Sequence, residues 1–162
     1  MLVRLVSLQL ELPGLKIEAR RPLLPVEAVI FLSNQNPDEI AADCERGLFK
    51  YAFDISAPGA ARRELRIYRD CVLHLVQPKL PLPKDLAEVF DAILPKRGLR
   101  STELQRTLSC SLQLVRDLDD AQLIKVERER LAVSGPRSSR VYSRASIVAF
   151  LQSRFLGTPT SN

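Results

Sequence analysis

The residues best suited to specific chemistry are polar and cationic side chains in the C-terminal half of the chain. Ser111 and Gln113 carry hydroxyl and amide groups that can hydrogen-bond to the edges of DNA bases, and Arg116 follows one helical turn further on. Four more arginines follow within residues 128–140, at Arg128, Arg130, Arg137 and Arg140. Arginine donates paired hydrogen bonds to phosphates and to guanine edges. These residue types therefore indicate a polyanionic partner such as nucleic acid.

The distribution of charge supports this interpretation more strongly than the total does. The formal net charge is +5, from 24 Lys and Arg against 19 Asp and Glu. Residues 96–162 contain 12 Lys and Arg against 6 Asp and Glu, whereas residues 1–95 contain 12 against 13. The excess positive charge therefore lies in the C-terminal part, as in proteins with a basic nucleic-acid-binding surface. A solvated basic face without a partner is the alternative interpretation.

The sequence lacks the motifs of common catalytic and metal sites. His74 is the only histidine, and no Ser or Cys nucleophile stands at a recognised spacing from it. No Gly-rich phosphate loop, HExxH motif or EF-hand pattern occurs. Cys44, Cys71 and Cys110 are far apart without a CxxC pair, so we expect three buried free thiols. The sequence therefore predicts a protein that is not an enzyme and that holds no cofactor or metal.

Two short helices joined by a tight turn are expected to position the polar residues at 111–116. Thr102, followed three residues later by Gln105, predicts a capping box at the start of the first helix. A turn over residues 109–111 leads to the second helix, over residues 111–122. Apolar residues at helical spacing predict which faces are buried. They are Leu104 and Leu108 in the first helix, and Leu112, Val115 and Leu118 in the second.

A β-hairpin is expected after the second helix, carrying the four later arginines. Residues 124–131 and 140–142 predict its strands, and the turn-forming residues at 132–139 predict its tip. Ser143 is expected to cap a last helix. The buried residues of that helix are predicted to be Ile147, Phe150 and Leu151. A winged helix-turn-helix has this order of elements: one helix enters the major groove and the hairpin contacts the neighbouring backbone.

The same region resembles a known family. Residues 99–152 are similar to the MerR/excisionase-like winged helix-turn-helix domains, through the run Leu104–Leu108 before the turn and the run Arg140–Leu151 after the hairpin. In that family the returning strand leads directly into a capped helix that ends in an aromatic–leucine pair. The resemblance implies binding of double-stranded DNA, by a transcription regulator or by an accessory factor for recombination or replication of a mobile element.

The N-terminal half predicts a similar order of elements after an initial β-hairpin. Asn36 with Glu39 predicts a second capping box, and Gly47 predicts a left-handed residue at the end of that helix. The expected elements are a hairpin over 2–20, helices over 25–33 and 36–47, strands over 49–55 and 65–68, and a helix over 69–76. Aligning Glu27 with Glu103, and Arg69 with Arg144, predicts an internal duplication.

The complete pattern predicts an α+β fold, mainly helical, made of two small winged helix-turn-helix-like domains. The first domain, including its β-hairpin, is expected to cover residues 1–76. The Pro-rich segment 77–83 is expected to be a stiff extended linker. The second domain is expected over residues 84–156, followed by a disordered tail at 157–162.

The two predicted copies differ in their suitability for DNA. The second helix of the first copy carries four acids, which the phosphates of a duplex would repel. They are Asp38, Glu39, Asp43 and Glu45. This copy is therefore expected to contact protein, or to contact DNA mainly through Lys50, Arg62 and Arg63. The candidate DNA-contacting residues of the whole chain are Lys50, Arg62, Arg63, Arg97, Arg100, Ser111, Gln113, Arg116, Arg128, Arg130, Arg137 and Arg140.

A second class of function is also open at this point. A winged-helix adaptor that binds protein and has lost DNA binding would have the same elements, but it has no general need for the arginines of the hairpin. A homodimer, or a protein partner held by the N-terminal domain, fits either function. No apolar run approaches the ~20 residues that span a bilayer. We therefore expect no membrane association and a cytoplasmic, nucleoid-associated location.

Overall fold

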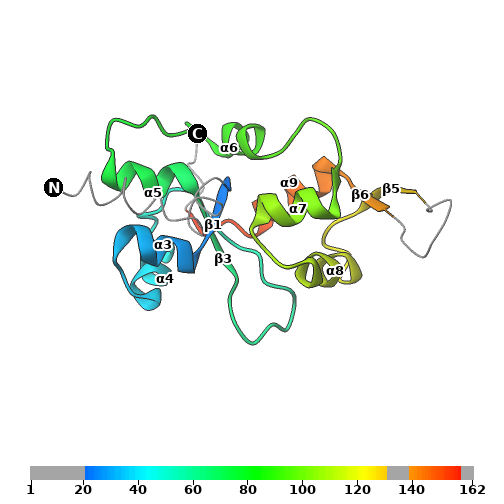
Figure 1. The fold of residues 1–162 in the computed structure, drawn as a ribbon, viewed down its shortest axis with the longest axis horizontal. Helices are drawn as coiled ribbons and strands as arrows, with labels where there is room; N and C mark the ends of the chain where they lie inside the picture. Colours follow the sequence, from blue (N-terminus) through cyan, green and yellow to red (C-terminus); the bar gives the residue numbers. More distant parts are fainter. Residues whose placement is uncertain (1–20, 131–138, 158–162) are drawn as a thin grey trace.

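The computed structural model describes residues 21–130 and 139–157, and within them the fold is α+β (Figure 1). Seven helices and two three-stranded antiparallel sheets are present in these ranges. The first unit consists of β1 (Leu23–Pro25), α3 (Val26–Ser33), α4 (Pro37–Glu45), β2 (Ala52–Asp54), β3 (Leu65–Tyr68) and α5 (Arg69–Val76). After α6 (Leu86–Ile93), the second unit consists of β4 (Leu99–Arg100), α7 (Ser101–Leu108), α8 (Leu112–Asp120), β5 (Val126–Arg130), β6 (Ser139–Tyr142) and α9 (Arg144–Ser153).

Three predicted features lie outside the described residues. They are the N-terminal β-hairpin at 2–20, most of the hairpin tip at 132–139 and nearly all of the tail at 157–162. No helix in the described ranges is both long enough and apolar enough to cross a membrane.

Local capping signals set the limits of α4. The Asn36 side chain accepts a hydrogen bond from the Glu39 backbone N–H at 2.9 Å, and the Glu39 carboxylate accepts one from the Asn36 N–H at 2.9 Å. These two bonds satisfy backbone donors that the first helical turn leaves without partners. Gly47 has a φ of +75°, the left-handed conformation predicted after the helix. Both predictions for this helix are confirmed.

The two units have the same element order and the same sheet topology. Their strand orders are β1-β3-β2 and β4-β6-β5, with Leu24 opposite Ile67 and, at the equivalent place, Leu99 opposite Tyr142. Asn36 and Ser111 are equivalent caps, because each side chain accepts from the backbone N–H three residues later. This equivalence places Glu27 on Thr102, so the predicted alignment of Glu27 with Glu103 is wrong by one residue. Apolar spacing alone did not distinguish the two registers.

Three details of the helices correct the sequence predictions. The capping box of α7 does not use Thr102 and Gln105, because the Glu103 carboxylate accepts from the Arg100 N–H at 2.9 Å and the helix begins at Ser101. Leu112 was predicted to be buried but is 38% exposed, since Val115 and Leu118 face inward. The sequence spacing of Cys71, Val72 and Leu75 predicts that they share one face of the helix over 69–76, yet Leu75 is 54% exposed whereas Cys71 and Val72 are buried.

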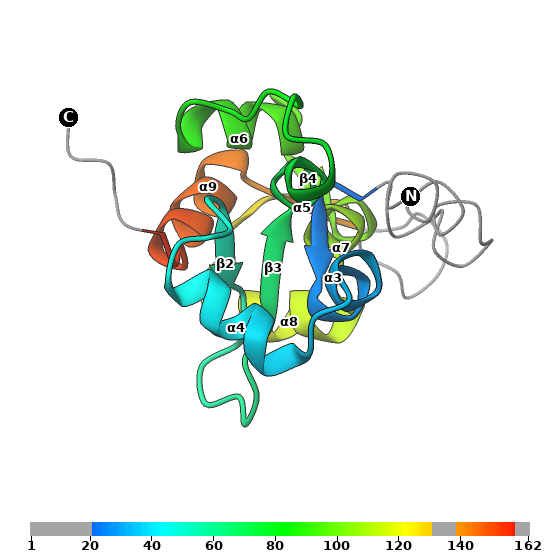
Figure 2. The ribbon, with the colours of Figure 1, turned by 90° about the vertical axis from the view of Figure 1, so that its left-hand side faces the viewer.

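The two units share one continuous hydrophobic core. Phe53 on β2 is fully buried, and its ring centroid lies 6.3 Å from that of Phe90 on α6 and 5.9 Å from that of Phe155. The chain after α9 runs beside β2, where the Asp54 N–H donates to the Arg154 carbonyl at 2.9 Å. Figure 2 shows α6 and α9 together on the side of the molecule opposite α8. The units are therefore packed as a single body.

The Pro-rich segment 77–83 is held against this body and is not fully extended. Its chain turns where the Leu80 N–H donates to the Gln77 carbonyl at 2.9 Å. The Tyr51 hydroxyl donates to the Pro83 carbonyl at 2.7 Å. The domain limits at 76 and 84 stay a prediction.

We expect the three thiols to be unreactive while the protein is folded. All three are buried, and desolvation raises the pKa of Cys44 to about 12 and the pKa values of Cys71 and Cys110 to about 11. Because the thiolate is the reactive form, a disulfide reagent at pH 8 should modify none of them within minutes. Unfolding in urea should expose all three, and rapid modification of any one in the native protein would contradict the described packing.

Candidate nucleic-acid interface

The α7–turn–α8 segment places all three of its predicted site residues at the surface. Ser109 turns the chain with a φ of +49°, and the Ser111 hydroxyl then caps α8 by accepting from the Leu114 N–H at 3.1 Å. Gln113 and Arg116 are exposed on α8. The Gln113 side-chain amide donates to Asp117 at 2.8 Å, so this group already has a partner within the helix.

The β5–β6 hairpin adds cations beside α8. Arg128 is exposed on β5, whereas the Arg140 guanidinium on β6 donates to the Asp119 carboxylate at 2.7 Å. The Tyr142 hydroxyl donates to the same carboxylate at 3.1 Å. Burial and the adjacent Asp119 charge raise the pKa of Tyr142. The carboxylate thus connects the hairpin to α8. Arg130 pairs with Ser139 through the strand backbone, and Arg137 lies outside the described residues.

The cations before α7 differ in their ion pairing. Arg97 donates to the Glu103 carboxylate at 2.6 and 3.0 Å, although its side chain is 63% exposed. The Arg97 guanidinium and the Arg100 N–H lower the pKa of Glu103 to about 2. Glu103 is therefore ionised at neutral pH and offsets the charge of Arg97. Arg100 itself is exposed.

Two of the three candidate cations in the first unit have structural roles. Lys50 donates to the carbonyls of Pro83 and Lys84 at 3.0 Å each, and so holds the Pro-rich segment. Arg63 forms ion pairs with Glu45 at 2.5 Å and with Asp54 at 2.9 Å. Arg62 is exposed on the β2–β3 loop, residues 55–64, and has no ion pair within the described ranges.

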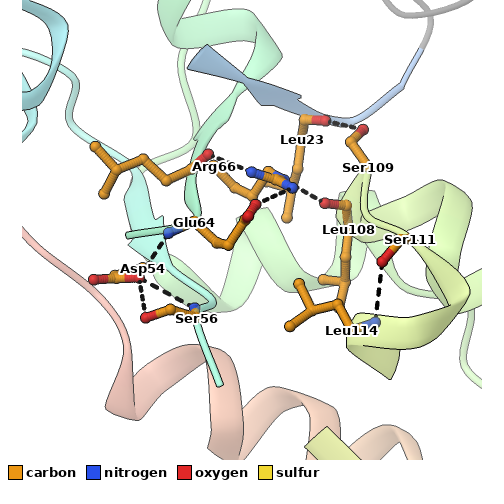
Figure 3. Close-up of polar contacts among 10 residues, drawn as sticks. Leu23, Asp54, Ser56, Glu64, Arg66, Leu108, Ser109, Ser111 and Leu114 are labelled. Atoms are coloured by element: carbon orange, nitrogen blue, oxygen red, sulfur yellow. Dashed lines mark hydrogen bonds and ion pairs between the residues drawn. The ribbon is translucent and has the colours of Figure 1, made fainter. Parts of the chain in front are cut away.

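Arg66 and Ser109, which the sequence did not indicate as site residues, connect the two units at the turn before α8 (Figure 3). Arg66 on β3 is only 6% exposed, and its Nε donates to the Leu108 carbonyl at 2.7 Å. It also donates to the Leu65 carbonyl at 2.8 Å and to Glu64 at 2.9 Å. The Ser109 hydroxyl donates to the Leu23 carbonyl at 2.5 Å. The sheet of the first unit therefore fixes the end of α7 and the turn.

A groove separates the β2–β3 loop from α8. It has a volume of about 780 Å³, and its walls include Ala60 and Arg62 from the loop and Ser111 and Gln113 from the second unit. In Figure 1 the β2–β3 loop, α8 and the β5–β6 hairpin follow one another along the long axis of the molecule. Three neighbouring elements therefore carry Arg62, Arg116 and Arg128. Lys50 instead contacts the Pro-rich segment.

Comparison of this chain with protein-family models, with curated proteins and with solved structures gives no match.

Proposed function

We propose that this protein binds double-stranded DNA, as a transcription regulator or as an accessory factor for recombination or replication of a mobile element. In this proposal residues 84–156 are a winged helix-turn-helix domain: α8 enters the major groove and the β5–β6 hairpin contacts the adjacent backbone. The order of elements from β4 to α9, and the resemblance to MerR/excisionase-like domains, support this assignment.

The observation that carries the proposal is the placement of two exposed arginines on the two elements that would meet DNA. Arg116 is exposed on α8 and Arg128 is exposed on β5, and neither forms an ion pair among the residues described. Their charges can therefore meet phosphates without first breaking an ion pair among the described residues. Release of counterions from the DNA would then favour binding.

Contacts to the DNA backbone should contribute more to affinity than contacts to bases. The Ser111 oxygen already accepts the capping hydrogen bond, and the Gln113 amide is bonded to Asp117. Reading a base with Gln113 would require this bond to be exchanged. The carboxylates of Asp117 and Asp120 also lie on the same helix and repel phosphate. We therefore expect modest sequence specificity in the isolated protein.

The second candidate function is a protein-interaction adaptor with a winged-helix fold. Its support is that Arg97 and Arg140 are paired with Glu103 and Asp119 instead of being left for a polyanion. The acidic residues exposed on α4 further suit the first unit to a protein partner or to a second copy of the chain, as either function allows.

A salt series on the purified protein tests DNA binding. Affinity for random duplex DNA should fall steeply as salt rises, and the logarithmic slope should become shallower by ~1–2 in an Arg116→Ala/Arg128→Ala variant, because each lost phosphate contact contributes ~0.9. Titration at five or more salt concentrations by fluorescence anisotropy measures both slopes.

A charge-matched variant provides the control. Lys79→Ala/Lys84→Ala removes the same formal charge from exposed positions in and beside the Pro-rich segment, which runs along the edge of Figure 1 opposite α8. Its slope should equal that of the unaltered protein. Absence of binding, or equal slopes for all three proteins, would leave the adaptor as the better account.

A further inference from the structure

We propose that the β2–β3 loop of the first unit is a second DNA-contacting element, which reaches the sugar–phosphate backbone on the side of α8 away from the β5–β6 hairpin. This inference rests on the proposed function, because it requires α8 to lie in a major groove. A helix in that groove is flanked by a phosphate backbone on each side. An element beside α8 therefore faces one of these backbones, and each unit would supply one such element to the same helix.

The position of the loop relative to α8 is the first support. Residues Ala57, Ala60, Ala61 and Arg62 form one wall of the groove, and Ser111, Gln113, Leu114 and Asp117 contribute to the other. In Figures 1 and 2 the loop projects from the body on the same side as α8. A duplex lying across the opening of the groove would meet both walls.

The second support is that hydrogen bonds fix both the base of the loop and the turn before α8. The Asp54 carboxylate accepts from the Ser56 N–H at 3.1 Å, the Ser56 hydroxyl at 2.7 Å and the Glu64 N–H at 3.3 Å (Figure 3). These bonds join the two ends of the loop. Arg66, adjacent to the loop, bonds to the Leu108 carbonyl before α8. The spacing between loop and helix is therefore set before any DNA binds, which limits the entropy cost of using both.

The composition of the loop suits close approach to a backbone. Residues 57–61 are Ala, Pro, Gly, Ala and Ala, which have no long side chain to hold a phosphate away. Arg62 follows them and is exposed without an ion pair among the described residues. Arg63, the next residue, is directed instead to Glu45 and Asp54. The loop thus presents one available cation beside a small-residue surface.

Charges around the groove predict that removing an acid there should strengthen DNA binding, whereas removing Arg62 should weaken it. Arg21, Arg62 and Arg66 border it, together with the acids Glu27, Glu64 and Asp117. Glu64 is paired with Arg66, and Asp117 accepts the Gln113 amide. Glu27 is exposed and forms neither an ion pair nor a side-chain hydrogen bond among the described residues. Its charge would therefore repel a DNA backbone lying over the groove. Removing that charge should strengthen binding.

Two single substitutions test the inference through opposite changes in affinity. On a duplex selected from a random pool, Arg62→Ala should make the salt slope shallower by roughly one. Lys79→Ala, which removes one positive charge at the opposite edge, should leave the slope unchanged. Glu27→Gln should raise affinity at low salt, and misfolding cannot produce that gain. Unchanged affinity and slope for both Arg62→Ala and Glu27→Gln would overturn the proposal.

A cleavage experiment locates the loop on the DNA directly. Ala60→Cys introduces an exposed thiol into a chain whose native thiols are buried, so an iron chelate can be attached there selectively. The chelate should cut the duplex in one cluster, next to the cluster cut from an equivalent Gln113→Cys conjugate. Cutting from position 113 but not from position 60 would contradict the inference about the loop and would still support DNA binding by α8. Failure of the unaltered protein to bind DNA would contradict both the proposed function and this inference.

Discussion

Truncating Phe53 to alanine is expected to destabilise the entire chain by about 3–5 kcal/mol and to leave a single unfolding transition. Phe→Ala changes in protein cores cost this much because transferred apolar surface and packing contacts are lost together. Phe53 is fully buried at the junction of β2, α6 and the segment after α9, where its ring packs near Phe90 and Phe155. Loss of this ring therefore weakens both units at once.

Urea denaturation with pulsed thiol labelling tests the expectation, because the three thiols report on different units. Cys44 and Cys71 lie in the first unit and Cys110 in the second, and all are buried. Their labelling midpoints should coincide in the unaltered protein and should shift together in Phe53→Ala. Phe31→Ala is the matched control, since Phe31 is 38% exposed and should cost roughly 1 kcal/mol or less. Separate midpoints for Cys44 and Cys110 would mean that the units unfold independently.

Signals that act within a few residues allowed much of the fold to be predicted. Asn36 and Glu39 fix the start of α4 because cap and carboxylate bond to backbone groups three residues away. The start of α7 was predicted wrongly because two overlapping residue pairs could form a capping box, Thr102 with Gln105 and Arg100 with Glu103. The Glu103 side chain carries a full charge and also pairs with Arg97. It therefore accepts the hydrogen bond from the Arg100 N–H, and the helix begins before Thr102.

The short edge strands could not be predicted from local pattern. β4 has two residues and β1 has three, which is too few to display an alternating period. Each is defined by a distant partner: Leu23 pairs with Tyr68, and Leu99 with Tyr142. Their existence follows from the tertiary arrangement and not from their own composition.

The candidate interface was predicted in part, and ion pairing explains the remainder. The sequence gives the positions of the cations but does not indicate which carboxylates approach them. Arg140 meets Asp119 across the second unit, and Arg63 meets Glu45 across the first. The sequence therefore overstated the number of arginines available to a polyanion, whereas Arg62, Arg116 and Arg128 keep the exposure that such a role requires.

Replacing Arg66 with alanine is the second change with a large expected effect, a loss of about 2–4 kcal/mol of stability. Alternation along β3 would direct Arg66 to solvent, yet the second unit covers that face and leaves the side chain 6% exposed. Its removal deprives the buried Leu108 carbonyl of its donor at 2.7 Å and opens a cavity between the units. Arg63→Ala, which breaks more exposed ion pairs, should cost less than about 1 kcal/mol.

Arg66→Met separates the hydrogen bonds from the packing, because methionine fills much of the same volume without a donor. If the hydrogen bond to the Leu108 carbonyl positions the turn, this variant should remain folded but lose hydrogen-exchange protection at residues 109–112, while α5 keeps its own protection. Its DNA affinity should fall with that protection, since α8 would no longer be fixed relative to the β2–β3 loop. Native exchange rates at the turn, together with unchanged DNA binding, would show instead that Arg66 acts by packing alone and that the turn before α8 is rigid without it.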